Sequence, residues 1–489
     1  MERIKIEPGK IGIFGVGHPR YWTQFSGLKE RLNNYLRYFE ERIKEFNAQV
    51  VSAGIIDTPD KAHKAANLFA KENVDLIFCN MTTYARSHVL LPIVQKIKAH
   101  VVLIGLQPTP GMDYARATTF EQLANDNSTS LPEFSYALSR ANIDFSVVFG
   151  MLYEDGRAWK QIKEWAQVAT VIHSLSKAHI GLMGHPYEGM LDMYSDPTMF
   201  HTHFPGMEIQ MLEMSDLKIR IDSITSNEIN VKKKEIRDFF CFPPPGADPI
   251  AGPVSEEDLD WSARVAVGLD KLISDYSLDG LAYYSRGRCG VIDVGTEYER
   301  IIPGMIVGNS LLTGKGIPVA GEGDVKNCVA MFIMDRFGIG GSFSELHPAD
   351  FREDFVLIGH DGPAHIAISD RKPILRGLTK LHGKYGYGVS VEFNVKKGPI
   401  TILSLSQTHD GKFYFVAAEG ESLPGPIPAT GNTNTRAKFP PDVVTFIEKW
   451  TEAAPTHHHA LGIGHNISKI KKLSKALRMQ LIVVSERTD

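Results

Sequence analysis

Short apolar segments alternate with amphipathic ones over the first third of the chain. Residues 11–16 and 49–56 are each apolar over the length of one buried strand. Between them, residues 28–46 carry a leucine, phenylalanine or isoleucine every three or four positions, which predicts a helix. Thr58 followed by Pro59 is typical of the start of a further helix. This alternation, with strands rich in Val and Ile, predicts a parallel sheet covered by helices on both faces.

A second region of the same kind begins near residue 178. Residues 178–184 and 278–284 have the composition of buried strands, and residues 255–276 have the pattern of a long helix. The segment before this region, residues 155–176, predicts one long helix that would connect two α/β domains.

The pattern changes after about residue 340. Residues 355–360, 387–393, 400–405 and 412–418 are strand-like segments at short spacing, separated by turns that contain Gly and Pro. Such spacing predicts an antiparallel barrel or sandwich rather than a third parallel sheet.

Composition narrows the class of protein. The 489 residues suffice for two to four domains. Lys and Arg total 53 against 57 Asp and Glu, so the net charge of -4 excludes a strongly basic surface for nucleic acid. Apolar runs all stay below the ~18 residues that a membrane span needs, so no membrane partner is expected. The four cysteines lie far apart without a CxxC motif, which favours a reducing, cytoplasmic location.

Candidate chemistry first appears at the end of the first strand. His18, Arg20 and Tyr21 lie beyond the carboxyl end of residues 11–16, which is where doubly wound sheets bind ligands. They bring an imidazole, a guanidinium group and an aromatic ring to one short segment.

Glu322 is the most distinctive acidic residue. It lies between Gly321 and Gly323, directly before an apolar helix. Glycines allow close backbone turns that present the intervening side chain to a cavity. The alternative is an ordinary acidic helix start, in which Glu322 and Asp324 only interact with the helix dipole.

Further carboxylate and imidazole groups follow in the last third of the chain: Glu345, His360 at a strand end, and the run His457, His458 and His459. A histidine at a strand end is also common as a structural residue. As a set, these oxygen and nitrogen donors suit Mn²⁺, Mg²⁺ or Co²⁺ better than a structural zinc ion, which favours thiolates.

These pieces occur together in a known order. Residues 302–305 (IPGM), 321–326 (GEGDVK), 340–345 (GGSFSE), 359–360 (GH) and 457–458 (HH) resemble the L-arabinose isomerase family, within the arabinose/fucose isomerase group. The resemblance implies a metal-dependent aldose–ketose isomerase that uses Mn²⁺, with L-arabinose and L-ribulose as the default substrate pair.

The resemblance also assigns roles to residues. It implies that Glu322, Glu345, His360 and His458 bind the metal, with His457 or His459 as alternatives to His458 if the alignment shifts by one position. Glu322 and Glu345 would also be catalytic, because they would move a proton between C1 and C2 through a cis-enediol.

The implied fold is two doubly wound parallel α/β domains followed by an antiparallel β-barrel domain. The boundaries would be residues 1–176, a central domain of residues 177–342 with Glu322, and a barrel of residues 343–489 with the other three metal ligands. The family also implies a homo-hexamer whose active sites lie at subunit junctions and take a small sugar.

Substrate-binding positions of the family correspond to His18, Arg20, Tyr21, Tyr84 and Met190. The chain departs from the family at two of them, because His18 and Arg20 stand where an amide and an aliphatic residue are usual. Arg20 would bind an acidic group on a sugar or pair with a surface carboxylate.

A further departure is the segment 125–134, which lacks the histidine that the family's loop provides. Two alternative functions therefore remain: a non-catalytic sugar-binding or sensor protein, and a metal-dependent sugar epimerase or hydrolase.

Overall fold

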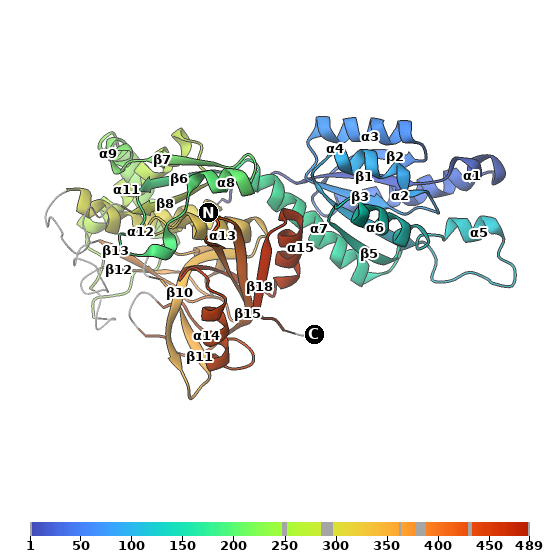
Figure 1. Ribbon diagram of the computed structural model, residues 1–489. Coiled ribbons are helices and arrows are strands. Elements are labelled where there is room, and N and C mark those ends of the chain that lie inside the picture. Colours follow the sequence, from blue (N-terminus) through green and yellow to red (C-terminus); the bar gives the residue numbers. More distant parts are fainter. Residues whose placement is uncertain are drawn as a thin grey trace. The chain divides into compact units, whose positions relative to one another are not determined.

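The structure is a computed structural model that describes residues 2–246, 252–284, 297–360, 363–377, 388–428 and 433–487. The chain forms two compact units (Figure 1). Unit 1 comprises Met1–Lys5, Leu175–Ile467 and Met479–Asp489, and unit 2 comprises Ile6–Ser174 and Ser468–Arg478. The chain therefore passes between the units at four points. The predicted division into three domains stays a prediction.

Unit 2 contains a five-stranded parallel sheet. Its strands are β1 (Lys10–Val16), β2 (Gln49–Ile56), β3 (Leu76–Asn80), β4 (His100–Gln107) and β5 (Phe145–Met151). They lie in the order β2-β1-β3-β4-β5, so the strand order reverses between β1 and β3. In doubly wound sheets this reversal opens a crevice at the carboxyl ends of the two strands.

Helices cover both faces of this sheet. On one face lie α2 (Leu28–Lys44) and α7 (Gly156–Leu175), with the rings of Phe39 and Trp159 5.8 Å apart. The other face carries α3 (Pro59–Glu72), α4 (Leu91–Lys96) and α6 (Ser130–Arg140). Thr58 caps α3 as predicted, since its side chain accepts a hydrogen bond from the Lys61 N–H. Two short helices, α1 (Pro19–Gln24) and α5 (Thr119–Ala124), complete this part.

Unit 1 contains a four-stranded parallel sheet in the order β7-β6-β8-β9. Its strands are β6 (His179–Gly184), β7 (Glu208–Leu212), β8 (Gly280–Tyr284) and β9 (Val319–Ala320). The apolar residues of α9 (Met214–Asp222), α11 (Glu256–Asp275) and α12 (Glu297–Lys315) share one core with these strands. Two further helices of this unit are α8 (Pro197–His203) and α10 (Ser226–Phe239).

Helix α13 (Val325–Arg336) follows β9 and is buried along its whole length. Cys328 of α13 lies against Gly280 of β8. A Cβ atom added to Gly280 would lie only 3.1 Å from the Sγ atom of Cys328. Because α13 also contacts strands of the barrel, it lies between the parallel sheet and the barrel.

The barrel is a closed ring of six antiparallel strands. These are β10 (Gly340–Asp350), β11 (Phe355–Gly359), β14 (Gly398–Gln407), β15 (Phe413–Leu423), β16 (Thr435–Lys438) and β17 (His459–Ile463). The ring runs β14-β17-β10-β11-β16-β15 and closes through the β14–β15 pair. β18 (Gln480–Ser485) adds to β15 in parallel. The predicted fold class, two parallel α/β domains and an antiparallel barrel, is confirmed.

The remaining elements of the last third are small. β12 (Ile374–Gly377) pairs with β13 (Val389–Glu392), and α14 (Val443–Glu452) precedes β17. α15 (Ile467–Leu477) belongs almost wholly to unit 2, where Lys472 Nζ lies 2.7 Å from Glu164 Oε2 of α7.

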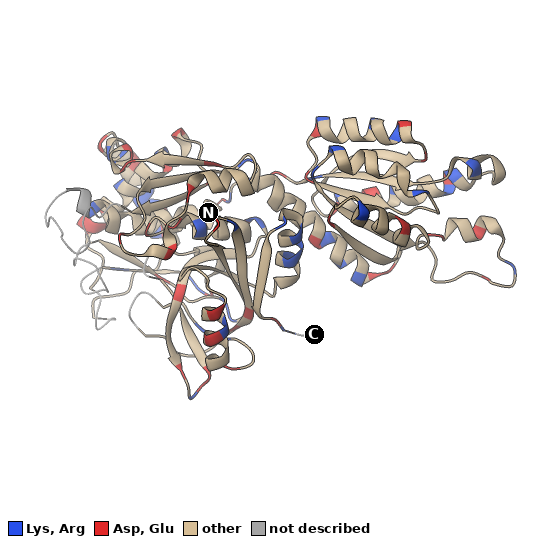
Figure 2. Cartoon of the chain, in the orientation of Figure 1, with Lys and Arg blue, Asp and Glu red and all other residues tan. Residues whose placement is uncertain are grey.

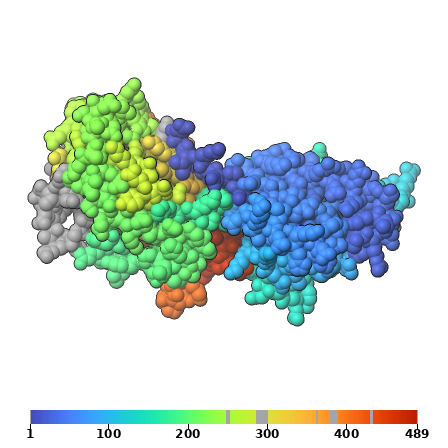
Figure 3. Space-filling model, turned by 90° about the horizontal axis from the view of Figure 1, so that it is seen from above, coloured from blue at the N-terminus to red at the C-terminus, as the bar shows by residue number. Residues whose placement is uncertain are grey.

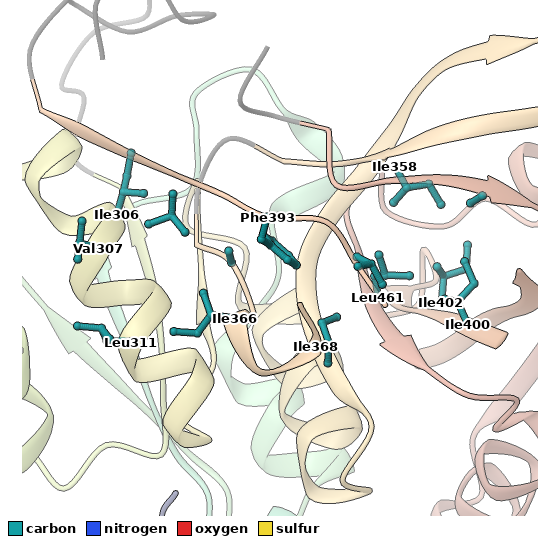
Figure 4. Close-up of a cluster of buried hydrophobic side chains, with 14 of the residues drawn as sticks. Ile306, Val307, Leu311, Ile358, Ile366, Ile368, Phe393, Ile400, Ile402 and Leu461 are labelled. Atoms are coloured by element: carbon teal, nitrogen blue, oxygen red, sulfur yellow. The ribbon is translucent and has the colours of Figure 1, made fainter. Parts of the chain in front are cut away.

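The core of unit 1 is continuous from α12 into the barrel. Ile306, Val307 and Leu311 of α12 belong to the same buried cluster as Ile402 and Leu461 of the barrel strands (Figure 4). The first described residues also pack on unit 1 (Figure 3), since the Ile4 N–H donates to the Lys315 carbonyl oxygen at 2.9 Å.

Surface charge agrees with the balanced composition. Lys and Arg are interspersed with Asp and Glu over the described helices of both units (Figure 2). Within the described residues, every helix is too short or too polar to cross a bilayer.

Candidate metal centre

The Glu322 side chain is presented by a strained backbone between β9 and α13. Glu322 and Gly323 both have left-handed conformations, with φ of 58° and 74°. The segment is held by two backbone hydrogen bonds, Tyr187 N–H to the Glu322 oxygen at 2.9 Å and Gly323 N–H to the Tyr283 oxygen at 3.0 Å. A Cβ atom on Gly323 would lie 2.6 Å from the His185 carbonyl oxygen, so this position requires glycine. Such strain is typical of functional sites.

The Asp324 side chain, which follows Gly323, contacts two different groups. Its Oδ1 caps α13 by accepting the Asn327 N–H at 2.9 Å, and its Oδ2 lies 3.0 Å from Nδ1 of His458. Both side chains are fully buried. A buried carboxylate accepts from an imidazole N–H, so His458 carries its proton on Nδ1 and has a lone pair on Nε2.

The barrel contributes two further groups through one strand pair. Glu345 of β10 is paired with Gly359 of β11, and His360 follows directly. Phe343 packs against both imidazoles, with its ring centre 4.5 Å from that of His360 and 4.3 Å from that of His458. The strand register therefore brings Glu345 and His360 to the start of α13.

These side chains form two groups that could each hold a cation. One is Glu322, His457 and His458, and the other is Glu345, His360 and His458, with the ligand atoms of each group within 4.8 Å of one another. Glu322 connects the two groups, since its Oε2 lies 3.6 Å from His458 Nε2 and its Oε1 lies 4.0 Å from His360 Nε2. All four metal ligands implied by the sequence thus lie together.

The contact between Glu322 and His458 is where a cation fits. Glu322 Oε2 and His458 Nε2 are both buried and have no hydrogen-bond partner among the described residues. Both atoms present lone pairs to each other, because the only ring proton of neutral His458 is on Nδ1. Two acceptors at 3.6 Å repel unless a positive charge lies between them. Carboxylate oxygens and imidazole nitrogens together suit Mn²⁺, Mg²⁺ or Co²⁺.

Neighbouring charges shift the pKa values of His457 and His458 differently. Burial lowers the pKa of His458, although Asp324 partly opposes this, and the lowered pKa favours the neutral ligand form. Burial acts in the same direction on His457, but the hydrogen bond and charge of Asp192 outweigh it and raise the pKa of that residue. The pKa values of His457 and His458 are therefore shifted in opposite directions although the two residues are adjacent.

Sequence reasoning missed Asp192. Its Oδ2 accepts the His457 N–H at 2.9 Å and lies 2.6 Å from His457 Nδ1. The available signal was its position in the segment that follows β6, at the carboxyl end of a parallel strand. Met190, which was predicted to bind substrate, lies two residues earlier in that segment and is half-buried.

His459, the third histidine of the run, is not part of either group. It is wholly buried in β17 with its ring 5.7 Å from that of Trp450, and burial lowers its pKa to about 3. It is a neutral core residue.

A cavity of about 280 Å³ begins beside Asp192. It is also lined by Lys326, whose Nζ donates to the Tyr194 carbonyl oxygen at 3.0 Å. Burial lowers the pKa of Lys326. The cavity places polar groups and space for a small molecule beside Asp192, the hydrogen-bond partner of His457.

The other predicted substrate residues lie in unit 2. His18, Arg20 and Tyr21 follow β1, and Tyr84 follows β3. The ring of His18 is 4.8 Å from that of Tyr21 and 6.4 Å from that of Tyr84. The rings of His18, Tyr21 and Tyr84 therefore lie together after the carboxyl ends of β1 and β3, where the strand order reverses.

Known proteins similar to this chain are sugar isomerases. The L-arabinose isomerase of Aeromonas salmonicida is 20% identical over 421 residues, which cover 83% of this chain and 80% of that protein. L-arabinose isomerase 2 of Clostridium acetobutylicum is 19% identical over 377 residues, covering 73% and 71%. The sulfoquinovose isomerase of Priestia megaterium is 22% identical over 173 residues, covering 35% and 38%. No family model matches the chain. The matches support a sugar isomerase without indicating a specific one.

Proposed function

We propose that this protein is a divalent-metal-dependent aldose–ketose isomerase. The observation that carries the proposal is the pair of facing lone pairs on Glu322 and His458, with Glu345 and His360 beside them. The similarity to isomerases that act on sugars supports the same reaction class. L-arabinose to L-ribulose is the default reaction.

Glu322, Glu345, His360 and His458 would hold the ion, and Mn²⁺ is our first choice. When bound, the ion would polarise the carbonyl or hydroxyl oxygen of the sugar. Glu322 and Glu345 reach the site from different elements, so each can approach a different carbon of the substrate. One carboxylate removes the proton from C2 of the aldose while O1 gains a proton, which gives a cis-enediol. The O2 proton is then lost as a proton is delivered to C1, which gives the ketose.

The remaining chain would bind the sugar. His18, Arg20, Tyr21, Tyr84 and Met190 are the proposed contacts. We further propose a homo-hexamer with its active sites at subunit junctions, which sedimentation analysis of the purified chain tests.

The decisive experiment incubates the purified chain with Mn²⁺ and a panel of aldoses and measures ketose formation. Glu322→Gln keeps the shape of the side chain but cannot accept the proton, so turnover falls by about 10³-fold or more. Glu452→Gln, at the exposed end of α14, is the matched control and keeps full activity.

Two results would overturn the proposal. Turnover that survives Glu322→Gln contradicts the proton-transfer role. A metal-free protein that binds sugar with undiminished affinity indicates a sensor. In D₂O, an isomerase places deuterium on a sugar carbon, whereas a hydrolase does not.

A further inference from the structure

Four basic residues follow two adjacent strands of unit 2. His18 and Arg20 follow β1, while Arg86 and His88 follow β3. β1 and β3 are adjacent parallel strands at the point where the sheet order reverses, so the segments after them emerge at the same edge. We call His18, Arg20, Arg86 and His88 the cationic edge.

The cationic edge has no acidic partner. Within the described part of the chain, Arg20, Arg86 and His88 are exposed and form no ion pair. Arg31, which is half-buried in the same unit, does pair with a carboxylate, Glu121, at 3.0 Å. The expected pairing of Arg20 with a surface carboxylate is therefore absent among these residues.

The nearby acids are directed at the backbone. Glu133 Oε1 accepts the Ser87 N–H at 2.7 Å, and Asp126 Oδ1 accepts the Thr129 N–H at 3.4 Å. The positive charge of the cationic edge acts on His18, whose pKa is lowered first by burial and then by Arg86, Arg20 and His88.

The geometry of His18 adds a directed donor. Its Nδ1 accepts the Arg20 N–H at 3.3 Å, so the ring proton of the neutral imidazole is on Nε2. The rings of Tyr21 and Tyr84 flank it. Two guanidinium groups, a neutral N–H donor and two aromatic faces together fit an oxyanion attached to a sugar: the guanidinium groups bind its oxygens and the rings pack on the carbon skeleton.

We propose that the cationic edge binds an acidic group of the substrate, so that the substrate is a sugar carrying a carboxylate, sulfonate or phosphate. The inference rests on the proposed isomerase function and specifies its substrate class.

The first test compares sugars of one configuration that differ at C6, together with L-arabinose. D-glucose, D-glucuronate, D-glucose 6-phosphate and sulfoquinovose are offered to the full chain with Mn²⁺. At least one acidic sugar is expected to exceed both neutral sugars in kcat/KM by about 100-fold, as two charge-assisted contacts allow. The preferred acidic sugar identifies the oxyanion. A neutral sugar that equals or exceeds all acidic ones overturns the inference and leaves the isomerase function standing.

The second test removes the cations one at a time. Arg20→Gln and Arg86→Gln each lower kcat/KM for the acidic sugar by about 10- to 100-fold more than for a neutral sugar, through KM. Arg140→Gln serves as the control, because it removes an exposed arginine at the end of α6. Arg140 precedes the amino end of β5, whereas the cationic edge follows the carboxyl ends of β1 and β3. Equal losses for acidic and neutral sugars contradict the inference.

Calorimetric measurement of sugar binding tests the anion site independently of the isomerase function. If no sugar is converted, the isomerase function fails, and titration of the same acidic sugars into the Mn²⁺-loaded chain decides the inference. Binding that Arg20→Gln and Arg86→Gln weaken at least tenfold upholds the cationic edge as an anion site. Binding that they leave unchanged, or the absence of binding, overturns it.

Discussion

The metal centre of unit 1 and the cationic edge of unit 2 are both built on residues that follow parallel strands. Glu322 follows β9, just as His18 follows β1. Their environments are opposite. The groups around Glu322 include fully buried Asp324 and His458, whereas Arg20 and Arg86 are exposed.

The difference follows from what each site has to do. Proton transfer and metal binding need ligand atoms in fixed positions, which burial and hydrogen bonds to a second set of residues provide. Attraction of a charged substrate needs accessible cations with no internal partner, because an internal carboxylate would neutralise them. One sheet topology thus supports either chemistry, according to the residues that follow its strands.

The largest effect concerns a buried imidazole that is not a metal ligand. His100 of β4 lies 3.0 Å from Ser146 Oγ and stacks on Trp165, and burial lowers its pKa from 6.5 to about 4. The unfolded chain then binds more protons than the folded one below pH 6.5. The free energy of unfolding should fall by about 3 kcal/mol as the pH drops from 6.5 to 4.

Urea unfolding at several pH values checks this. His100→Gln should remove most of that pH dependence, whereas His63→Gln, an exposed residue on α3, should preserve it. An unchanged pH slope in His100→Gln would show that other groups dominate acid unfolding.

Metal addition should stabilise the protein by a similar amount. Mn²⁺ at 100 times its Kd raises the free energy of unfolding by about 2.7 kcal/mol if it binds only the folded chain. His360→Gln should abolish the increase in thermal stability, and His201→Gln on the exposed part of α8 should retain it. Stabilisation that survives His360→Gln would place the ion elsewhere.

Asp324→Asn tests the carboxylate that orients His458. An asparagine can still cap α13 with its oxygen, but it then turns an N–H₂ donor toward His458 Nδ1 and moves the ring proton to Nε2. We expect the Kd for Mn²⁺ to rise by about 10- to 100-fold in isothermal titration. Asp442→Asn changes a helix-capping aspartate of α14 that has no histidine partner, so its Kd should equal that of the original chain. A normal Kd in Asp324→Asn would contradict the proton assignment.

The smallest effect is electrostatic screening. If the exposed cationic edge attracts an acidic sugar, kcat/KM should fall by about three- to tenfold between 0.05 and 0.5 M salt. Arg86→Gln should make this dependence shallower. A steep dependence that persists in the variant would locate the attraction at another part of the surface.

The sequence was most informative where a local pattern decides the structure. Helix α3 begins where Thr58 and Pro59 predicted, and the apolar runs became the strands of two parallel sheets. Glu322 was recognised because its flanking glycines mark an unusual backbone, and Gly323 has a left-handed conformation that a side chain could not occupy.

Local sequence patterns could not predict contacts between segments that are distant in the chain. Asp324 was interpreted as a helix-dipole residue, and it does cap α13, but its second partner, His458, is 134 residues away. Asp192 and His457 are 265 residues apart. Local periodicity carries no information on which loop faces which strand end, so only the folded chain shows these pairs. The departures at His18 and Arg20 were visible, but the lack of acidic partners was not.

The path of the chain has a consequence for synthesis on the ribosome. Unit 2 receives its last segment, Ser468–Arg478, only after nearly all of unit 1 has been made, and unit 1 needs both the first residues and Met479–Asp489. Neither unit can complete its fold before the segments that follow residue 467 have been made. The Glu164 carboxylate of α7 therefore lacks the ammonium group of Lys472 until the segment that contains α15 has been made. We expect truncations that remove α15 to leave two incomplete units instead of one intact unit. We also expect nascent chains of this protein to depend on protection from aggregation until that segment has been made.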